Sequence, residues 1–385
     1  MKIAIVGPGF TGATFPLAQH LNQMGHKIDC YYLTHIGLSS VESLDFDGPL
    51  KGTPIIQEIP KTNRLYKYLN NDINVFIIPI HVRHLKLEKL IIGLPLKLSN
   101  YLRKNTFVKK LHKKKYDRII LIDQFDNEQI GKALAKFGEN FVTSYHEVLT
   151  KLLGTPVLRE RVKHSLQLGR PAILHCNKLK DDVVNLSGIK NIEDRLSVIR
   201  VGPFESLWQY GEGKAVAGIK DGYFLFLGRI IPYKGVSILY NAIESLRPEY
   251  ENNVVIAGKG NDPILKEMMK NKSYQIINRY ISNAEMVWLV KHCRAIVCPY
   301  IAASQSGLMP LAFAYNKPII ATKVGAFPEV IDDGISGFLS ESITEDSFAN
   351  AIKRCIDSEK SFTGKPLPES INWDYIAKQV LKVLE

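Results

Sequence analysis

Two cations stand close together in one short loop of the second half of the sequence. Arg229 and Lys234 lie between Gly228 and Gly235, directly after the apolar run of residues 223–227. A guanidinium can grip two phosphate oxygens, and an ammonium adds a compact positive charge. If the apolar run is a strand of an open α/β sheet, this loop follows its carboxyl end, where such sheets bind ligands. The spacing predicts a diphosphate site; the alternative is an ordinary charged surface loop.

A second stretch with anion-binding chemistry follows another apolar run, residues 295–297, and leads into a predicted helix over residues 308–315. Unpaired backbone amides and the positive dipole end favour an anion at a helix start. A capping serine explains one serine of this stretch but not the whole run. We therefore expect the same ligand to contact Ser304, Gln305, Ser306, Gly307 and Leu308.

A third candidate is the first loop of the chain, where residues 7–12 match Gly-x-Gly-x-x-Gly. Glycines allow close backbone approach to a phosphate, so Gly9, Phe10 and Thr11 are predicted to border the ligand. The alternative is a tight turn that only packs a helix on the sheet. NAD binding is disfavoured, because residues 32–35 offer no acidic side chain for a ribose.

These loops need strands before them and helices after them. Short apolar runs bounded by polar residues predict parallel strands buried on both faces. The predicted strands are residues 3–6, 28–33, 75–78, 119–122, 141–142 and 173–174 in the first half and residues 223–227, 254–256, 295–297 and 319–321 in the second. The pattern predicts an α/β protein with two Rossmann-like, doubly wound domains.

A length of 385 residues suits two such domains. Periodicity is lost over residues 203–220, which gather glycine and charged residues and predict a linker or hinge. We expect an N-terminal domain over residues 1–202 and a C-terminal domain over residues 221–371. An amphipathic helix over residues 372–385 is expected to close the chain.

Further motifs of the second half occur in a recognisable order. They are Ala257-Gly258-Lys259-Gly260, Gly325-Ala326-Phe327-Pro328-Glu329-Val330, and Asp332-Asp333-Gly334 with Gly337 beyond it. Together with the loop of Arg229 and Lys234, they resemble glycosyltransferase family 4 over residues 223–378. The first half resembles that family only at Gly7 to Gly12, Gly25-His26 and His146-Glu147.

The resemblance implies a GT-B fold, with two Rossmann-like domains facing a cleft, and it implies roles for several residues. Arg229 and Lys234 would bind the diphosphate of a nucleotide-sugar donor. The backbone of Arg279, Tyr280 and Ile281 would hold the nucleobase. His146 matches the histidine of the family that contacts the donor sugar, although a lone histidine is often only a packed residue.

The sequence departs from the family at its Glu-x7-Glu pattern. Aligning on Gly307 puts Ser304 and Ala312 at the two acidic positions, and aligning on Pro318 puts Ala303 and Leu311 there. Both carboxylates are missing in either case. The chain is either a variant in which Gln305 lies near the first position or a protein that has lost activity; we expect the variant.

Positive charge is concentrated in one block of the first half. The net charge is +12, and residues 83–118 hold twelve Lys or Arg and two acidic residues, so that the block carries ten of these charges. Apolar residues spaced three or four apart predict a basic amphipathic helix, or two broken at Pro95. Its apolar face either joins the core or meets a membrane. The block suits anionic lipid better than nucleic acid, with membrane-facing Lys109, Lys110, Lys113, Lys114 and Lys115.

Other classes of protein receive little support. Five scattered cysteines without CxxC spacing favour free thiols in the cytoplasm. The start of the chain is predicted to be a strand rather than a signal peptide, and no apolar run is long enough to span a bilayer. Asp45-Phe46-Asp47 matches the Asp-x-Asp motif of metal-dependent sugar transfer, but we take the match as coincidental and expect neither a metal nor a cofactor.

The sequence therefore predicts a hexosyltransferase of the GT-B kind that needs no metal. It would move a sugar from a nucleotide sugar to a glycan or lipid-linked acceptor, with retention by resemblance, in cell-surface polysaccharide or lipopolysaccharide synthesis. We expect it in the cytoplasm, peripheral on the inner face of the membrane. The alternatives are a catalytically inactive partner subunit and a GT-B sugar-nucleotide epimerase.

Overall fold

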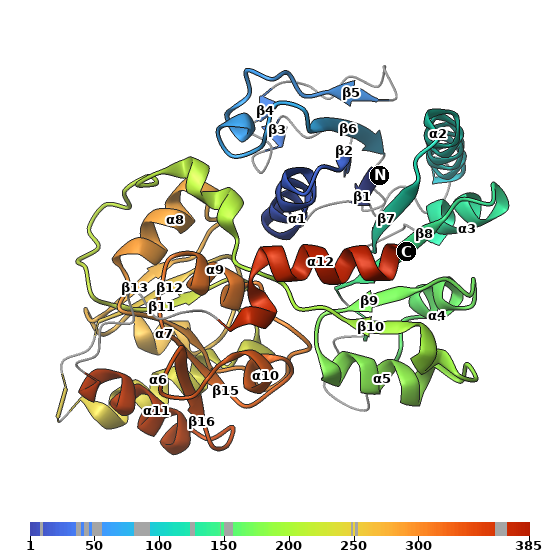
Figure 1. Ribbon diagram of the computed structural model, residues 1–385. Helices are drawn as coiled ribbons and strands as arrows, with labels where there is room; N and C mark the ends of the chain where they lie inside the picture. The colour runs from blue at the N-terminus through green and yellow to red at the C-terminus, as the bar shows by residue number, and fades with distance from the viewer. Residues whose placement is uncertain are drawn as a thin grey trace. The chain divides into compact units, whose positions relative to one another are not determined.

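The computed structural model describes most of the chain (Figure 1). The described residues are 1–7, 11–35, 40–41, 46–47, 56–80, 93–123, 128–146, 148–149, 157–247, 249–250, 253–358 and 368–385. The chain divides into two compact units. The first contains Met1–His175, Leu179–Arg200 and Trp373–Glu385, and the second contains Cys176–Lys178 and Val201–Asn372.

The first unit is built on an eight-stranded sheet in the order β10-β9-β8-β7-β1-β2-β6-β5. Neighbouring strands are parallel except β5 and β6. The strands are β1 (Lys2–Gly7), β2 (Lys27–His35), β5 (Gln57–Glu58), β6 (Asn74–Ile80), β7 (Arg118–Asp123), β8 (Phe141–Tyr145), β9 (Ala172–Leu174) and β10 (Leu196–Val198). A separate antiparallel pair is formed by β3 (Ser40–Val41) and β4 (Phe46–Asp47).

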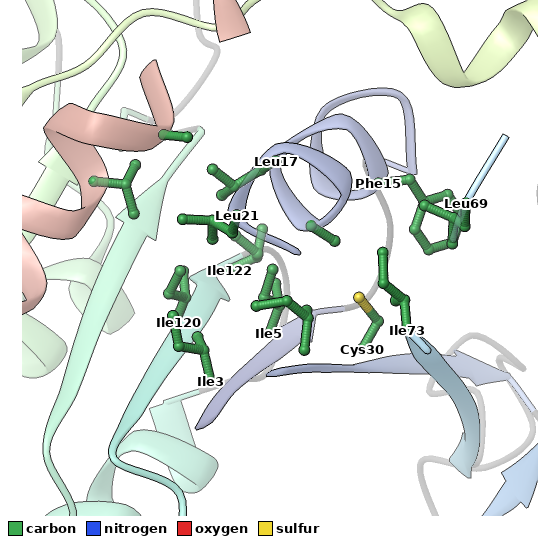
Figure 2. Close-up of a cluster of buried hydrophobic side chains, with 14 of the residues drawn as sticks. Ile3, Ile5, Phe15, Leu17, Leu21, Cys30, Leu69, Ile73, Ile120 and Ile122 are labelled. Atoms are coloured by element: carbon green, nitrogen blue, oxygen red, sulfur yellow. The ribbon is translucent and has the colours of Figure 1, made fainter. Parts of the chain in front are cut away.

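Alternate residues of β1 explain why both faces of this sheet are covered. Ile3 and Ile5 join a core cluster with Leu17 and Leu21 of α1 (Figure 2), whereas Ala4 and Val6 point to the opposite cluster. Burying a side chain such as Ile or Leu contributes about 1.5 to 3 kcal/mol. The helices of this unit are α1 (Thr11–Gln23), α2 (Gly93–Lys114), α3 (Glu128–Lys136), α4 (Glu160–Leu166), α5 (Asn177–Ser187) and α12 (Trp373–Leu384).

The last helix of the chain closes the core of the first unit. In α12, Trp373, Ile376 and Val380 are buried in the same cluster as Ile3 and Ile5. The Nδ1–H of His20 in α1 donates a 2.7 Å hydrogen bond to Oδ1 of Asp374 at the start of this helix. The predicted amphipathic closing helix is therefore confirmed.

The structure describes the basic helix from Gly93 onward, and residues 83–92 of the basic block lie outside the described residues. Helix α2 runs without interruption from Gly93 to Lys114, with Pro95 in its first turn. Proline is tolerated in the first turn, because the backbone N–H groups there have no partner inside the helix. The apolar face joins the core at Phe107, Val108 and Leu111, which are each no more than 1% exposed. No helix in the described parts of the chain is both long enough and apolar enough to cross a bilayer.

The second unit repeats the architecture with a six-stranded parallel sheet in the order β13-β12-β11-β14-β15-β16. The strands are β11 (Phe224–Leu227), β12 (Val254–Ala257), β13 (Tyr274–Ile277), β14 (Ala295–Cys298), β15 (Ile319–Thr322) and β16 (Gly337–Ser340). The helices are α6 (Val236–Leu246), α7 (Leu265–Met268), α8 (Asn283–His292), α9 (Leu308–Ala314), α10 (Phe327–Val330) and α11 (Glu345–Asp357).

Each sheet has a point where the strand order reverses. In the first unit, the strands that follow β1 in the chain are added on its β2 side up to β6, and those from β7 to β10 are added on its other side. In the second unit, β12 and β13 are added on one side of β11, and β14 to β16 on the other. Loops at the carboxyl ends of two such strands diverge and leave a crevice for ligands. In the second unit these are the loops that begin at Gly228 and Pro299.

Candidate functional site

The loop after β11 is fixed by contact with the loop after β14. Gly235 has φ +70°, and a Cβ atom added there would lie 1.7 Å from the carbonyl oxygen of Pro299. Only glycine permits this approach of two backbones. A short 3-10 helix, Pro232–Lys234, leads into it. The contact brings Lys234 to the start of the loop that carries the predicted serine run.

Lys234 lies over an aromatic ring. Its Nζ is 3.6 Å from the ring centroid of Tyr300, a distance at which a cation is attracted to the face of the ring. Tyr300 is 1% exposed, and burial raises the pKa of its hydroxyl well above the ordinary value, so the phenol is neutral. Thr322 Oγ1 donates a 2.6 Å hydrogen bond to the carbonyl oxygen of Tyr300 and fixes its backbone.

Arg229 is the second cation of this loop. Its side chain is exposed, and its Nη2 lies 3.5 Å from the hydroxyl of Tyr233, at the outer limit of a hydrogen bond. Among the residues that the structure describes, no carboxylate lies within ion-pair distance of Arg229. The guanidinium can therefore bind an anion without first giving up an ion pair.

The predicted serine run lies beside the same tyrosine. Ser306 is 8% exposed, its Oγ is 3.3 Å from the hydroxyl of Tyr300, and it accepts a 3.3 Å hydrogen bond from the backbone N–H of Leu308. Gly307 is exposed, whereas Ser304 and Gln305 are half-buried. The helix α9 that follows ends at Ala314, one residue before the predicted end, because Tyr315 and Asn316 leave helical geometry.

The loop after β15 contacts the backbone of the serine run. Gly325 has φ +57°, and a Cβ atom there would lie 2.4 Å from the carbonyl oxygen of Ala303. The N–H of Ala326 donates a 3.0 Å hydrogen bond to the carbonyl oxygen of Ser304. The start of the Gly-x-x-Pro-Glu-Val motif therefore holds the serine run in place.

The predicted nucleobase loop follows β13. Arg279 makes two hydrogen bonds with Glu285, of 2.9 and 2.8 Å, and one of 3.0 Å with the carbonyl oxygen of Tyr280. The guanidinium lowers the pKa of Glu285 to about 2. Arg279 is thus engaged in holding its own loop. Tyr280 is 69% exposed and Ile281 is half-buried.

One side chain joins this loop to its neighbour. Asn278 accepts a 3.0 Å hydrogen bond from the N–H of Gly260 and donates one of 2.9 Å to the carbonyl oxygen of the same residue. Gly258, two residues earlier, has φ +144°, and a Cβ atom there would lie 1.8 Å from the carbonyl oxygen of Gly228. The loops after β11, β12 and β13 therefore form one connected rim. The sequence analysis missed Asn278 and Tyr300. Asn278 follows β13, a strand that the sequence analysis did not predict, so its position gave no signal.

In the first unit, His146 follows β8 directly and is 3% exposed. Its ring stands 4.1 Å, centroid to centroid, from that of His175. The Nδ1 of His175 lies 2.7 Å from the carbonyl oxygen of Ile199, so this nitrogen carries the proton and Nε2 accepts from Ser144 Oγ at 3.0 Å. The sequence analysis missed His175.

Burial controls the charge of both histidines. It lowers the pKa of His146 well below the ordinary value, with a further contribution from His175, and lowers the pKa of His175 to about 4. Both imidazoles are therefore neutral near pH 7. A neutral imidazole can donate or accept a hydrogen bond without placing a charge beside a ligand.

Several predicted residues cannot be placed. Gly9, Phe10, Glu147 and Asp45 lie outside the described residues, and Asp47 is described only as part of β4. Thr11 is the first residue of α1. Within the described parts of the chain, no three His, Cys, Asp or Glu side chains gather as metal ligands.

The five lysines predicted to face a membrane occupy the C-terminal half of α2 and the residue after it. Lys109, Lys110, Lys113, Lys114 and Lys115 are all exposed. Lys114 also reaches Asp29, with Nζ 3.4 Å from Oδ2.

Known protein sequences match part of this chain, whereas solved structures match its fold over the full length. Residues 221–358 match the family described as "Glycosyl transferases group 1". An uncharacterized glycosyltransferase of Methanocaldococcus jannaschii is 27% identical over 203 residues, which are 51% of this chain and 55% of that protein. The chain thus spans about half the length of the curated relatives it matches.

The solved structures that cover this chain completely include the following two. A glycosyltransferase from Rickettsia africae gives a TM-score of 0.61 at 16% identity, with 97% of its own chain covered. Anabaena HepE in complex with UDP and glucose gives 0.58 at 17% identity, also with 97% covered. At such identities the likeness shows the fold: two parallel-sheet α/β units of the GT-B type.

Proposed function

We propose that the chain is a glycosyltransferase that moves a hexose from a nucleotide sugar to a glycan or lipid-linked acceptor. One observation carries this proposal: Arg229, Lys234 and Ser306 gather at the reversal point of the second sheet, inside the segment that matches glycosyl transferases group 1. The complex of Anabaena HepE with UDP and glucose supports a nucleotide-sugar donor for this fold.

The proposed chemistry places positive charge where negative charge develops. As the bond between the anomeric carbon and the diphosphate breaks, the electron pair leaves with the diphosphate oxygen. Arg229 and Lys234 bind this leaving group and stabilise it more strongly as its charge increases. Lys234 is oriented for this by the ring of Tyr300 beneath its ammonium group. Since these cations supply the charge, the reaction proceeds without a metal or a cofactor.

The remaining donor contacts follow the predicted loops. The backbone of Arg279, Tyr280 and Ile281 holds the nucleobase, and Ser304 to Leu308 border the diphosphate. Gly9, Phe10 and Thr11 border the donor from the first unit. His146 donates or accepts a hydrogen bond to a sugar hydroxyl as a neutral imidazole, consistent with its burial and depressed pKa.

The missing carboxylates bear on the mechanism. Ala312 and Leu311 are 0% and 2% exposed, so the second acidic position of the family is part of the core under either alignment. Ser304 or Ala303 occupies the first position. We infer that the backbone and Gln305 replace the usual contacts and that transfer proceeds with retention. An inactive partner subunit remains the alternative, and the assay below separates the two.

The basic surface of α2 locates the proposed activity. Five exposed lysines close to one another are attracted to anionic lipid. We propose that they hold the protein on the cytoplasmic face of a membrane, where it serves the synthesis of a cell-surface polysaccharide or lipopolysaccharide.

The test is donor hydrolysis and binding with a panel of UDP, GDP and ADP sugars. Arg229→Ala and Lys234→Ala should each weaken donor binding and turnover ten- to a hundredfold, because a charge-assisted hydrogen bond contributes about 1.5 to 3 kcal/mol. Lys272→Ala, at an exposed lysine of the same unit, is the matched control and should retain both.

Three outcomes would contradict the proposal. Unchanged kinetics in both variants would remove the phosphate site, and binding without hydrolysis or transfer would favour the inactive partner. Release of an epimerised sugar instead of a transferred one would favour the epimerase. EDTA should change the rate less than about twofold, since protein cations replace the metal. Loss of activity that Mg²⁺ or Mn²⁺ restores would implicate Asp45 and Asp47.

A further inference from the structure

A cavity of about 320 Å³ lies in the first unit, between α2 and the sheet. Its walls come from Tyr31 of β2, Phe76 of β6, and Phe107 and Leu111 of α2. Sites for small molecules span about 300 to 1,000 Å³. This cavity, the α2 pocket, therefore has room for one small ligand or for the end of one chain.

The interior of the α2 pocket is apolar and well packed. Tyr31, Phe107 and Leu111 are 2%, 0% and 1% exposed. The rings of Tyr31 and Phe76 stack with their centroids 4.9 Å apart, and the ring of Phe107 is tilted against Tyr31 at 5.3 Å. Such walls favour an aliphatic or aromatic group, because burial removes that group from water.

The rim of the α2 pocket is positively charged. Lys110, Lys113 and Lys114 also line the cavity, and none of the described lining residues is acidic. Lys114 holds its ammonium group 4.4 Å from the ring centroid of Phe76. Among the described residues, no carboxylate pairs with Lys110 or Lys113.

The carboxylate of Asp29, which lies beside Lys114, is already hydrogen-bonded. Asp29 accepts hydrogen bonds from the Tyr116 hydroxyl and from Asn74 Nδ2 at 2.8 Å, and Lys114 Nζ lies 3.4 Å away. Burial alone would lower the pKa of Lys114, but its contacts with Tyr31 and Asp29 raise that pKa overall. Asp29 therefore offsets Lys114, and the charges of Lys110 and Lys113 face the cavity without an acidic neighbour among its described lining residues.

The α2 pocket is separate from the loops at the carboxyl ends of the strands. The last turn of α2 leads directly into β7, so it lies where the parallel strands begin. Lys2, the first residue of β1, confirms this placement, because its Nζ donates a 2.6 Å hydrogen bond to the carbonyl oxygen of Lys114. The ligand loops follow the opposite ends of the strands.

We propose that the α2 pocket binds an anionic amphiphile: one alkyl chain that ends in a phosphate or a carboxylate. The chain lies against the accessible edges of Ile56 and Phe76, over the closely packed floor of Tyr31, Phe107 and Leu111, and the anionic group rests on Lys110 and Lys113. The pocket stands on its own geometry; only the origin of the amphiphile in a membrane rests on the proposed function.

The test uses the full chain and calorimetric titration with octyl phosphate below its micelle concentration. Octyl phosphate should bind at least about tenfold more tightly than inorganic phosphate or 1-octanol, because inorganic phosphate lacks the alkyl chain and 1-octanol lacks the anionic group. Lys113→Glu should weaken binding about tenfold or more. Lys109→Glu makes the same charge change on the same helix outside the pocket and should weaken it less than about threefold.

A second variant fills the cavity. Ile56, a half-buried lining residue, becomes tryptophan in Ile56→Trp, which should abolish the preference for octyl phosphate over inorganic phosphate while the protein keeps its Tm. Equal losses in Lys109→Glu and Lys113→Glu, or no preference for octyl phosphate in the unaltered chain, would overturn the pocket.

Vesicles of phosphatidylglycerol separate this inference from the proposed membrane role. Binding of octyl phosphate without binding to vesicles keeps the pocket, assigns it to a soluble amphiphile and removes the membrane role. Binding to vesicles without binding of octyl phosphate overturns the pocket and keeps the membrane role.

Discussion

The two units hold their candidate side chains at the carboxyl ends of parallel strands, but by different means. In the second unit, backbone meets backbone: Gly258 lies against the carbonyl oxygen of Gly228, and Gly235 lies against that of Pro299. In the first unit, His146 is held by burial beside another buried imidazole. Contact through glycine leaves a side chain such as that of Arg229 exposed and charged. Burial leaves a side chain neutral, and its environment depends on pH.

The units also differ in how their charge is placed. Most of the excess charge of the chain lies in residues 83–118, all of which belong to the first unit. The proposed donor site of the second unit has two cations, Arg229 and Lys234. Three experiments test whether membrane binding, loop geometry and pH sensitivity divide between the units in this way.

The largest effect is expected for membrane binding. Replacing Lys109, Lys110, Lys113, Lys114 and Lys115 by Gln should reduce co-sedimentation with anionic vesicles more than about a hundredfold at low salt. Each lysine near an anionic surface contributes about 1 kcal/mol, so five contribute up to about 5 kcal/mol before screening. Hydrolysis of a soluble donor should remain intact.

The matched control makes the same charge change on the second unit. Lys214, Lys220, Lys266, Lys270 and Lys272 are exposed there, and their replacement by Gln should leave vesicle binding nearly unchanged. If both sets weaken binding equally, net charge rather than the surface of α2 governs the association. If the unaltered protein ignores anionic vesicles, the block binds a soluble phosphorylated acceptor or a protein partner instead.

The second effect concerns the backbone contacts of the second unit. Gly258→Ala places a Cβ atom 1.8 Å from the carbonyl oxygen of Gly228 at φ +144°. Strained backbone and overpacking each cost about 1 to 3 kcal/mol, so a loss of about 4 kcal/mol in the free energy of unfolding is expected, together with loss of donor binding. Urea unfolding measures the free energy, and binding of the nucleotide-sugar panel measures the donor affinity.

Gly222→Ala is the control for backbone strain alone. Gly222 has φ +86°, but no atom lies within 4 Å of an added Cβ atom. It should cost about 1 kcal/mol and keep donor binding. Equal costs for the two variants would show that the loop contact at Gly258 does not matter.

The same contrast explains what the sequence could predict. The loop of Arg229 and Lys234 could be predicted because the glycines that allow close backbone contact occur at fixed positions in its sequence. The GT-B fold was predicted from the pattern of buried strands and the order of the motifs. Strand β13 was missed because it is short and contains Gln275. Strand β16 was missed because it starts at Gly337, which belongs to a turn motif.

Contacts between distant residues left weaker signals. The contact between Lys234 and the ring of Tyr300 joins two loops whose residues are 66 positions apart in the sequence. A tyrosine that follows a strand has no distinctive spacing, so the sequence did not indicate this contact. His175 could have been found, because it follows residues 173–174, which were predicted as a strand. Since neighbouring parallel strands end at the same edge, it belonged near His146. Of the basic block, the structure describes one helix from Gly93 onward with Pro95 in its first turn, and residues 83–92 lie outside the described residues.

The smallest effect concerns the buried histidines of the first unit. Burial lowers the pKa of His175 from 6.5 to about 4. Between these values the unfolded chain binds a proton that the folded chain does not, so the free energy of unfolding falls as pH falls. The contribution is complete above about pH 7 and is lost progressively toward pH 4. At pH 5 this one group should destabilise the fold by about 2 kcal/mol, since one pKa unit corresponds to about 1.4 kcal/mol.

Urea unfolding at pH 7.5 and pH 5.0, with hydrogen exchange to assign the change to the first unit, measures this slope. His175→Asn should flatten it, because asparagine can still donate to the carbonyl oxygen of Ile199 but does not titrate. His164→Asn, at an exposed histidine of the same unit, is the matched control and should keep the full pH dependence. A slope that persists in His175→Asn would assign the pH sensitivity to other groups, and a slope confined to the second unit would reverse the contrast between the two units.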